Sequence, residues 1–197
     1  MTSGAFEIGI IKQAWIDPKL ELDEAPNDLC SHGDIRLEIG GQVIVSSEAE
    51  PGEEVADWWT INTSALALLR TLESDHLPPD RRVADRLILH CGMIEMMNCG
   101  IGVDWSVRHL GGRVQLADVV RYDTTNEAKG VVRFPGLVVE VREDEYRRAV
   151  AAFAEEAKQL FVGREKTPSD EYEQQVYEEF WREYDERLNR ARSPFAE

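Results

Sequence analysis

The sequence predicts an α+β fold in which a mainly antiparallel sheet, built from hairpins, carries a central helix and two C-terminal helices packed on one side. Two observations lead to this prediction. Glycine pairs at Gly40-Gly41 and Gly111-Gly112 each separate two short segments with alternating apolar residues, which is typical of a β-hairpin with a two-residue turn. From Glu143 onward, apolar residues instead recur every three or four positions, as in amphipathic helices. Hairpins followed by helices favour the α+β class.

The first part of the chain is expected to form three strands. Residues 6–15 (FEIGIIKQAW) are a short apolar segment, residues 35–39 alternate strictly between apolar and polar side chains, and residues 42–45 return after the glycine pair. Such a tight turn would pair Leu37 with Ile44 on the buried face of the hairpin.

A central helix is expected in the segment ALALLRTLESDH, residues 65–76, where leucines recur at three-residue spacing. Thr63 or Ser64 would be its N-cap, because a side-chain oxygen there accepts a free backbone N–H. Pro78-Pro79 would end the helix, since proline cannot continue it.

Further strands are expected in the middle of the chain, at residues 86–91, 104–110, 113–116, 131–134 and 137–141. The second glycine pair would join two of them into a hairpin. In that hairpin Trp105, Val107 and His109 would share one face with Val114 and Leu116.

Two helices are expected at the end of the chain. The first covers residues 143–162 and ends at Gly163, a residue that favours the conformation found after helices. For the second, Thr167 is a suitable N-cap, Pro168 a suitable first residue, and Asp170 suits the first turn. This second helix would run to about residue 190.

The last helix carries an aromatic stripe that has two interpretations. Its members are Tyr172, Val176, Phe180, Tyr184 and Leu188 at every fourth position, widened by Tyr177 and Trp181. The stripe either packs on the rest of the chain as core, or holds another chain, since aromatic residues are common interface anchors. We therefore divide the chain into an α+β domain, residues 1–163, and a C-terminal helix, residues 164–197, that packs on this domain or mediates self-association.

The charge of the chain is strongly acidic and uneven. It has 38 acidic and 22 basic residues, a net charge of −16, and residues 17–57 alone contain 12 acidic and two basic residues. Such a field repels nucleic acid and anionic membranes, and it attracts cationic partners. The alternative is that the acidity only keeps the protein in solution.

Residues 17–57 therefore contain most of the predicted partner-binding surface. Its expected members are Asp17, Glu21, Asp23, Glu24, Asp28, Glu48, Glu50, Glu53, Glu54 and Asp57. Trp58 and Trp59 follow directly and are candidate anchors of the interface, because tryptophan is enriched among residues that dominate binding energy. The alternative for the two tryptophans is core packing before the central helix, with one of them buried and the other exposed.

Soft metal ligands and nucleophiles are sparse. The cysteines and histidines considered are Cys30, His32, His76, His90, Cys91 and Cys99. No C-x-x-C pair, no H-x₃₋₅-H pair and no G-x-S-x-G sequence is present, so no catalytic residue, metal or cofactor is predicted. Cys30, His32 and Cys91 are the weak metal candidates, and a Cys/His-dependent or zinc-binding enzyme is the alternative function.

Three other polar residues are expected to be structural. His109 would be packed at the rim of the apolar face with one nitrogen hydrogen-bonded. Asp34 and Asp104 each begin a strand near a glycine, and they would accept backbone N–H groups in turns.

The chain is expected to be cytoplasmic. An odd and small number of cysteines, three in all, suits a reducing compartment better than a disulfide framework. The first residues lack the basic and then apolar pattern of a secretory signal, and no apolar run is long enough to span a bilayer.

Three segments resemble small bacterial proteins of the immunity type, which accompany polymorphic toxins. They are LCSHGDIRLEIGG, WTINTSALALLRTLESDH and CGIGVDWSV, within a resemblance that covers Leu29 to Val141. The family pattern has two adjacent cysteines and a histidine after the glycine, where this chain has His90, Cys91 and Met93. The resemblance implies a cytoplasmic binding protein that neutralises a cognate toxin domain. The charge argument agrees, since an acidic inhibitor presents carboxylates where a nucleic-acid-cleaving enzyme expects phosphates.

Overall fold

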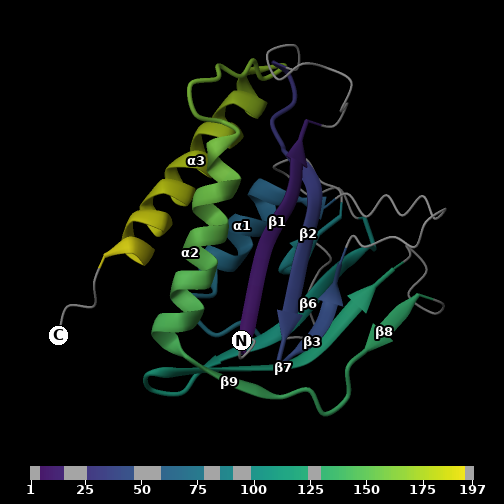
Figure 1. The fold of residues 1–197 in the computed structure, drawn as a ribbon. Coiled ribbons are helices and arrows are strands. Elements are labelled where there is room, and N and C mark those ends of the chain that lie inside the picture. Colours follow the sequence, from purple (N-terminus) through teal and green to yellow (C-terminus); the bar gives the residue numbers. More distant parts are fainter. Residues whose placement is uncertain are drawn as a thin grey trace.

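The computed structural model of the 197-residue chain describes residues 5–15, 26–46, 59–77, 85–90, 99–123 and 130–193. Within these ranges, strands form two antiparallel sheets and helices pack on one side of them, which confirms the predicted α+β class (Figure 1). No helix in these ranges is long and apolar enough to cross a membrane.

The first sheet contains the N-terminal strands. They are β1 (Phe6–Ala14), β2 (His32–Ile39), β3 (Gln42–Val45) and β4 (Trp59–Thr60), in the order β1-β2-β3 with β4 also paired to β2. The predicted hairpin is β2-β3, and its turn residues Gly40 and Gly41 have φ angles of 61° and 78°. Both lie in the left-handed region that glycine adopts at no steric cost, which is the reason for the glycine pair.

The predicted register of this hairpin is wrong by one residue. Leu37 lies opposite Val45 and not opposite Ile44, because the ladder shifts between Leu37 and Glu38. Ile44 is thus an additional residue on β3, as in a β-bulge. Leu37 and Ile44 are nevertheless both fully buried, so both belong to the core.

The second sheet contains the remaining strands. They are β5 (Ile88–Leu89), β6 (Gly102–His109), β7 (Arg113–Tyr122), β8 (Val131–Arg133) and β9 (Val139–Arg142), in the order β5-β6-β7-β8 with β9 also paired to β7. The predicted second hairpin is β6-β7, with Val107 opposite Leu116 and His109 opposite Val114. Trp105 is fully buried, so the predicted apolar face is also confirmed.

The two sheets and the helices share one hydrophobic core. Phe6 of β1 packs between Trp105 of β6 and Tyr146, with ring centroids 6.1 Å and 4.9 Å away. At the surface, the Arg121 guanidinium of β7 donates to the Ile44 carbonyl of β3 at 2.8 Å. These contacts hold the second sheet against the first.

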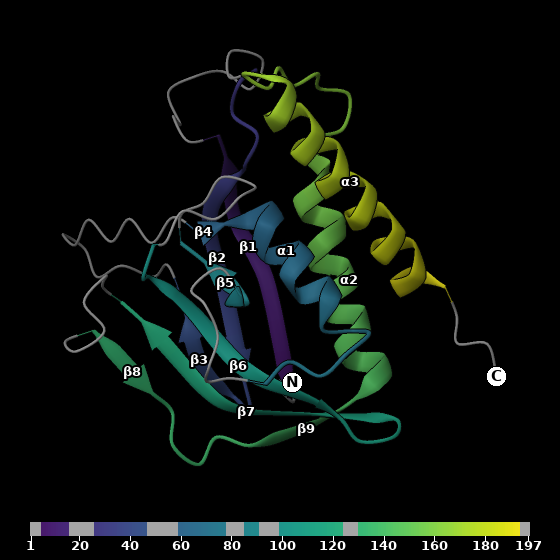
Figure 2. The same cartoon turned by 180° about the vertical axis from the view of Figure 1, so that it is seen from behind.

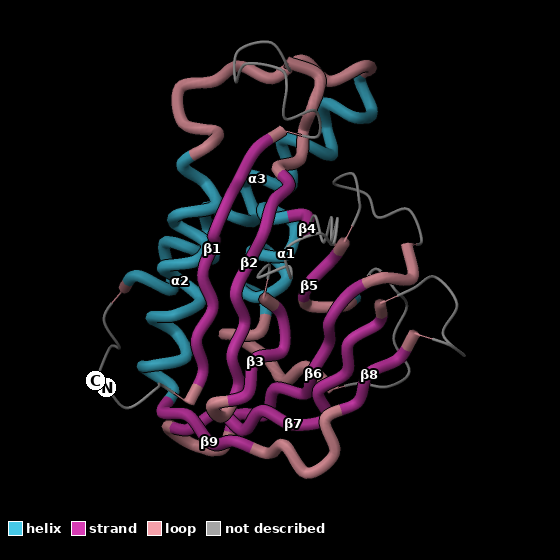
Figure 3. Tube along the Cα trace, turned by 45° about the vertical axis from the view of Figure 1, so that its right-hand side comes forward, coloured by secondary structure: helices cyan, strands magenta, loops and turns pink. Residues whose placement is uncertain are grey.

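The helices are α1 (Ile61–Arg70), α2 (Glu143–Gln159) and α3 (Glu171–Arg192). Figure 3 shows them on one side of strands β1 and β2. α2 lies along β1, α1 packs against α2, and α3 is the outermost helix, in contact with both (Figure 2).

The central helix begins earlier than predicted. Its N-cap is Thr60, and neither Thr63 nor Ser64 caps it. The Ser64 hydroxyl instead accepts the backbone N–H of Leu89 at 3.0 Å and so joins the helix to β5. A polar side chain that suits a cap can equally satisfy a neighbouring strand, and tertiary structure decides between the two.

The central helix also ends earlier than predicted. Its last residue is followed by Thr71, whose hydroxyl forms a 2.8 Å hydrogen bond with the Tyr146 hydroxyl in the core. The chain then pairs His76 with Val107 of β6 through two backbone hydrogen bonds of 2.7 and 2.8 Å. Pro78-Pro79, the predicted stop, lies beyond this bridge and outside the described residues.

The N-terminus of α3 differs from the prediction as well. Asp170, and not Thr167, is the N-cap, and its carboxylate accepts the Glu173 backbone N–H at 2.8 Å. The Glu173 carboxylate in turn accepts the Ser169 hydroxyl at 2.6 Å, which resembles a capping box. The Thr167 N–H donates to the Pro26 carbonyl at 2.8 Å, so it serves a loop contact.

The second half of α3 belongs to the core. Its buried residues are Phe180, Tyr184, Leu188 and Ala191. The Tyr184 hydroxyl donates to the Ala154 carbonyl of α2 at 2.7 Å. In the first half, Tyr172 is 62% exposed. The core interpretation of the aromatic stripe therefore describes only its second half.

An ion-pair network joins α3 to the end of α1. The Arg70 guanidinium donates two hydrogen bonds of 2.8 and 2.7 Å to the Glu183 carboxylate, which also accepts Arg187 at 2.7 Å. Arg187 and Arg190 both bind Glu73. Arg70 and Arg187 lower the pKa of Glu183 to about 2.

We predict that Leu188→Ala lowers the free energy of unfolding by about 2–4 kcal/mol, because a fully buried leucine leaves a cavity between α3 and the core. Denaturant unfolding measures the change. Asn189→Ala, at the exposed neighbouring position, is the control and should stay within about 0.5 kcal/mol of wild type. Equal losses in the two variants would contradict the docking of α3.

We predict that Glu183→Gln lowers the free energy of unfolding at neutral pH by about 0.5–1 kcal/mol, a value limited by solvent screening. The Glu183 contribution is fully present above the ordinary pKa of 4.5, and it is lost as the pH falls toward the folded value of about 2. The gap between wild type and variant should therefore close in acid.

Unfolding measured from pH 7 to about pH 3 tests this expectation. Glu156→Gln, at an exposed position of α2, is the control and should show no such gap. If the difference in free energy of unfolding between wild type and Glu183→Gln stays constant over this pH range, the charge of Glu183 contributes nothing to stability.

Candidate functional site

Most of the predicted partner-binding surface lies outside the described residues. This applies to Asp17, Glu21, Asp23, Glu24, Glu48, Glu50, Glu53, Glu54, Asp57 and Trp58. Asp28 is described and half-buried, and its carboxylate accepts the backbone N–H of Cys30 at 3.3 Å. Asp28 thus has a local structural contact in addition to its charge.

Trp59 is part of the core. Only 1% of the residue is exposed, and its ring meets the His90 ring edge to face at a centroid distance of 6.0 Å. A side chain buried this deeply cannot contact a partner. The core alternative therefore applies to Trp59, and its use as an interface anchor is ruled out in this conformation.

The weak metal candidates do not form a site among the described residues. Cys30 is 3% exposed, and burial raises the pKa of its thiol to about 12, so the thiolate that metals and electrophiles require is disfavoured. His32 is also buried, and burial lowers the pKa of its imidazole. Cys91 lies outside the described ranges, within which no three ligating side chains are placed to share a metal ion.

Two of the other soft-ligand residues do meet. The Cys99 sulfur lies 3.7 Å from Nδ1 of His90. His90 follows β5 and Cys99 precedes β6, so the pairing of these two strands brings the side chains together. One thiol beside one imidazole is too small a set to define a reaction, and the Cys/His-dependent enzyme stays an untested alternative.

His109 and Asp104, which are expected to have structural roles, both form hydrogen bonds to the segment that follows α1. His109 forms a 2.9 Å hydrogen bond between Nε2 and the Thr71 carbonyl, as expected for a rim histidine. Asp104, however, does not serve a turn. Its carboxylate lies 2.7 Å from Nε2 of His76, so it holds the segment after α1 on the second sheet.

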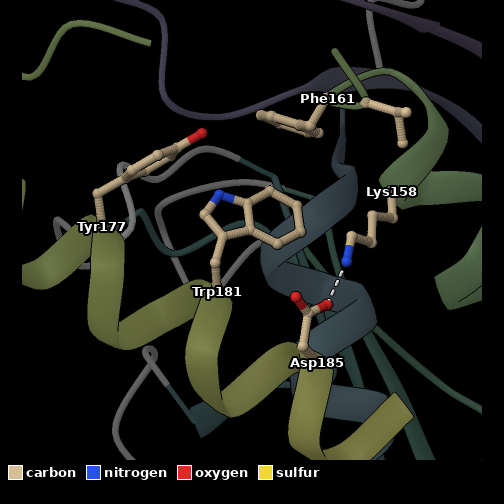
Figure 4. Close-up of a pocket in the computed structure, with 6 residues that line it drawn as sticks. Lys158, Phe161, Tyr177, Trp181 and Asp185 are labelled. Carbon is tan, nitrogen blue, oxygen red and sulfur yellow. Dashed lines mark hydrogen bonds and ion pairs between the residues drawn. The ribbon is translucent and has the colours of Figure 1, made fainter. Parts of the chain in front are cut away.

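A hollow of about 170 Å³ lies between the end of α2 and the middle of α3. Its lining residues, shown in Figure 4, are Lys158, Phe161, Val162, Tyr177, Trp181 and Asp185. We call this feature the aromatic hollow. Tyr177, Trp181 and Asp185 lie four residues apart on α3, which places them on one side of the helix.

The turn after α2 supplies the other side of the hollow. Gly163 has a φ of 73°, a conformation that reverses the chain at low cost for glycine only. Phe161 just before it meets Trp181 with a centroid distance of 4.7 Å. On the far side of Phe161, Trp15 packs edge to face at 5.0 Å. The end of β1, the turn and α3 are thus joined by aromatic contacts.

Two lysines lie near these rings, at different distances. Lys166 lies 3.1 Å from the centroid of the Trp15 ring, and Lys158 lies 5.9 Å from that of Trp181. Lys158 also forms an ion pair with Asp185 across the hollow (Figure 4). Burial against the rings lowers the pKa of Lys166 to about 8. Aromatic faces attract cations, so this environment accepts positive charge.

Acidic residues precede the aromatic hollow along α3. Residues 170–179 of α3 and its N-cap contain five acidic residues and no basic one: Asp170, Glu171, Glu173, Glu178 and Glu179. Two described residues that flank positions 16–25 in the sequence also lie at this end. Trp15 before it packs on Phe161, and Pro26 after it accepts the Thr167 N–H. The acid-rich start of α3 therefore lies at the same end of the molecule as Trp15 and Pro26.

Sequence reasoning missed this hollow. It placed Tyr177 and Trp181 beside the aromatic stripe, with core packing and an interface as the two interpretations, and it placed Phe161 on the apolar stripe of the preceding helix. The available signal was that Tyr177 and Trp181 lie beside the stripe rather than within it. A side chain beside the stripe can be only partly buried, and Trp181 is.

In comparisons with known proteins, no protein-family model, no curated protein and no solved structure matches this chain. Its function is therefore argued from its own residues.

We predict that the Cys30 thiol resists alkylation by iodoacetamide in the folded protein, because it is buried and its pKa is about 12. Cys99, which is more exposed, should react faster. Mass spectrometry of the tryptic peptides, with and without denaturant, measures both rates. Fast labelling of Cys30 without denaturant would contradict the buried thiol and would favour the Cys/His enzyme.

Proposed function

We propose that this chain is an acidic binding protein that neutralises a basic partner protein, in the manner of an immunity protein that holds a cognate toxin domain inactive. The observation that carries the proposal is an aromatic hollow in an acid-rich end of the molecule. Acidity alone would be sufficient for solubility, and it needs no particular place on the surface. Exposed aromatic rings inside the acidic region are better explained by binding.

The exposed groups at this end match the composition of binding sites. Trp181 and Tyr177 are partly exposed, and Val162 and Tyr172 are 58% and 62% exposed. Tryptophan and tyrosine are the residues that most often dominate the energy of protein interfaces, while surrounding polar groups exclude water. We therefore interpret the hollow as the anchor of the binding site and the acidic residues of positions 170–179 as its polar rim.

The charge would act mainly on the rate of association. With a net charge of −16, the chain attracts a basic partner from a distance and orients it toward the acidic end. Contacts at the aromatic hollow would then determine the rate of dissociation. A tight inhibitor needs both, because a toxin must be captured quickly and held for long.

Co-expression tests the proposed function. The gene immediately upstream would supply the cognate toxin, and co-expression of this chain should restore growth to cells that produce its C-terminal domain. Loss of viability with or without this chain, together with no binding of the two purified proteins, would overturn the proposal.

We predict that the association rate with that domain falls about tenfold or more when salt rises from about 0.05 M to about 0.5 M, because ions screen the long-range attraction. Replacing Glu171, Glu178 and Glu179 together by glutamine should slow association at low salt. Glu140→Gln, at an exposed position of β9 near the opposite end of α2, is the control and should leave the rate unchanged. Surface plasmon resonance measures these rates, and a salt-independent rate would contradict the steering.

A further inference from the structure

We infer that the aromatic hollow receives an arginine side chain of the basic partner, which lies on the Trp181 ring and pairs with Asp185. This inference rests on the proposed function and names the chemistry of its central contact. The hollow combines two features that a guanidinium uses at once: an aromatic face and a carboxylate, both supplied by α3 and one helical turn apart.

The first step concerns the aromatic face. Trp181 is packed by Phe161 at 4.7 Å, by Phe180 at 5.1 Å and by Tyr177 at 6.2 Å, all with steeply inclined rings. These neighbours hold the indole in one orientation while leaving it partly exposed in the hollow (Figure 4). Tryptophan is the best aromatic partner of a cation, and a ring already held in place costs little entropy on binding.

The second step concerns the cations already present. Lys166 shows how closely this aromatic environment accepts an ammonium group, with Nζ 3.1 Å from the Trp15 centroid. At Trp181, by contrast, Lys158 is 5.9 Å from the centroid, which is the outer limit of a cation–π contact. Lys158 therefore lies at one end of the hollow, where it pairs with Asp185, and does not cover the indole.

The third step concerns the carboxylate. Asp185 contacts Lys158 through Oδ1, and its side chain is 45% exposed. A carboxylate offers about four acceptor positions, so a second cation can bind beside the first. Planar guanidinium suits this arrangement better than ammonium, because it stacks on indole and presents paired N–H donors to a carboxylate. It is also less strongly hydrated, so its transfer from water into the hollow costs less.

The charge around the hollow selects for a cation. Glu178 lies three residues before Trp181 on α3, and five acidic residues without a basic one occupy positions 170–179. An anionic group would be repelled by these carboxylates, and a neutral apolar side chain would leave Asp185 without added compensation. A basic side chain that approaches along residues 170–179 meets complementary charge.

The experiment uses the full chain and a defined probe. The peptide acetyl-Gly-Arg-Gly-Arg-Gly-amide is compared with its citrulline form, which has nearly the same shape without the charge, and with its lysine form. Binding is followed by the indole N–H signals in ¹H–¹⁵N NMR spectra. The chain has five tryptophans, and the spectrum of Trp181→Phe identifies the signal of Trp181.

The arginine peptide should move the Trp181 signal, and the lysine peptide should bind about threefold or more weakly, as expected for the loss of stacking. The citrulline peptide should bind about tenfold or more weakly, because it lacks the charge. Asp185→Asn should weaken the arginine peptide about threefold or more. Glu186→Gln, the adjacent exposed position, is the matched control for net charge and should change the affinity less than about twofold. Thermal unfolding of each variant verifies that it is folded.

Three results would overturn the inference: equal binding of the arginine and citrulline peptides, movement of another tryptophan signal in place of Trp181, or equal weakening by Asp185→Asn and Glu186→Gln. The peptide assay needs no toxin, so it is independent of the growth assay. Rescue of growth without peptide binding at Trp181 would reject the arginine contact and leave the proposed function standing. Binding of the arginine peptide without any rescue of growth would reject the proposed function and leave the arginine contact at Trp181 standing.

Discussion

The burial of Tyr184 between α3 and α2 is the contact on which the candidate site depends. Its ring lies fully in the core, and its hydroxyl donates to the Ala154 carbonyl at 2.7 Å. A buried ring with one specific acceptor fixes the rotation of α3 about its own axis. That rotation turns Trp181 toward Phe161 and brings Asp185 to Lys158. The aromatic hollow therefore exists only while α3 is docked.

α3 uses different kinds of interaction along its sides. Apolar residues pack on the core, while ion pairs join Glu183 to Arg70 at the end of α1 and join Arg187 and Arg190 to Glu73 just after it. Since those pairs lie near the surface, they add specificity of placement more than stability. The remaining side presents Trp181 and Tyr177. If this side binds the proposed partner, its rigidity limits the conformational entropy that is lost on binding.

The sequence was a good guide where local chemistry has no competitor. Two glycine pairs predicted both hairpins, because each turn needs positive φ angles at both residues. It was a poorer guide where one side chain has several uses. Ser64 suits an N-cap but binds β5, and Thr167 suits an N-cap but its N–H serves the Pro26 carbonyl. The bulge at Ile44 has no sequence signal at all, since an inserted residue keeps the apolar character of its neighbours.

By itself the sequence determined the α+β class, the hairpins, the amphipathic character of the last helices and the acidity of the chain, because period, turn residues and charge are local properties. Only the tertiary structure decided what the aromatic residues do. Trp59 could be an interface anchor or a core residue and is buried, whereas Trp181, for which the same two interpretations stood, lines a surface hollow. The reason is physical: whether a ring is covered depends on which distant segment packs on it, and that partner cannot be inferred from the residues beside it in the chain.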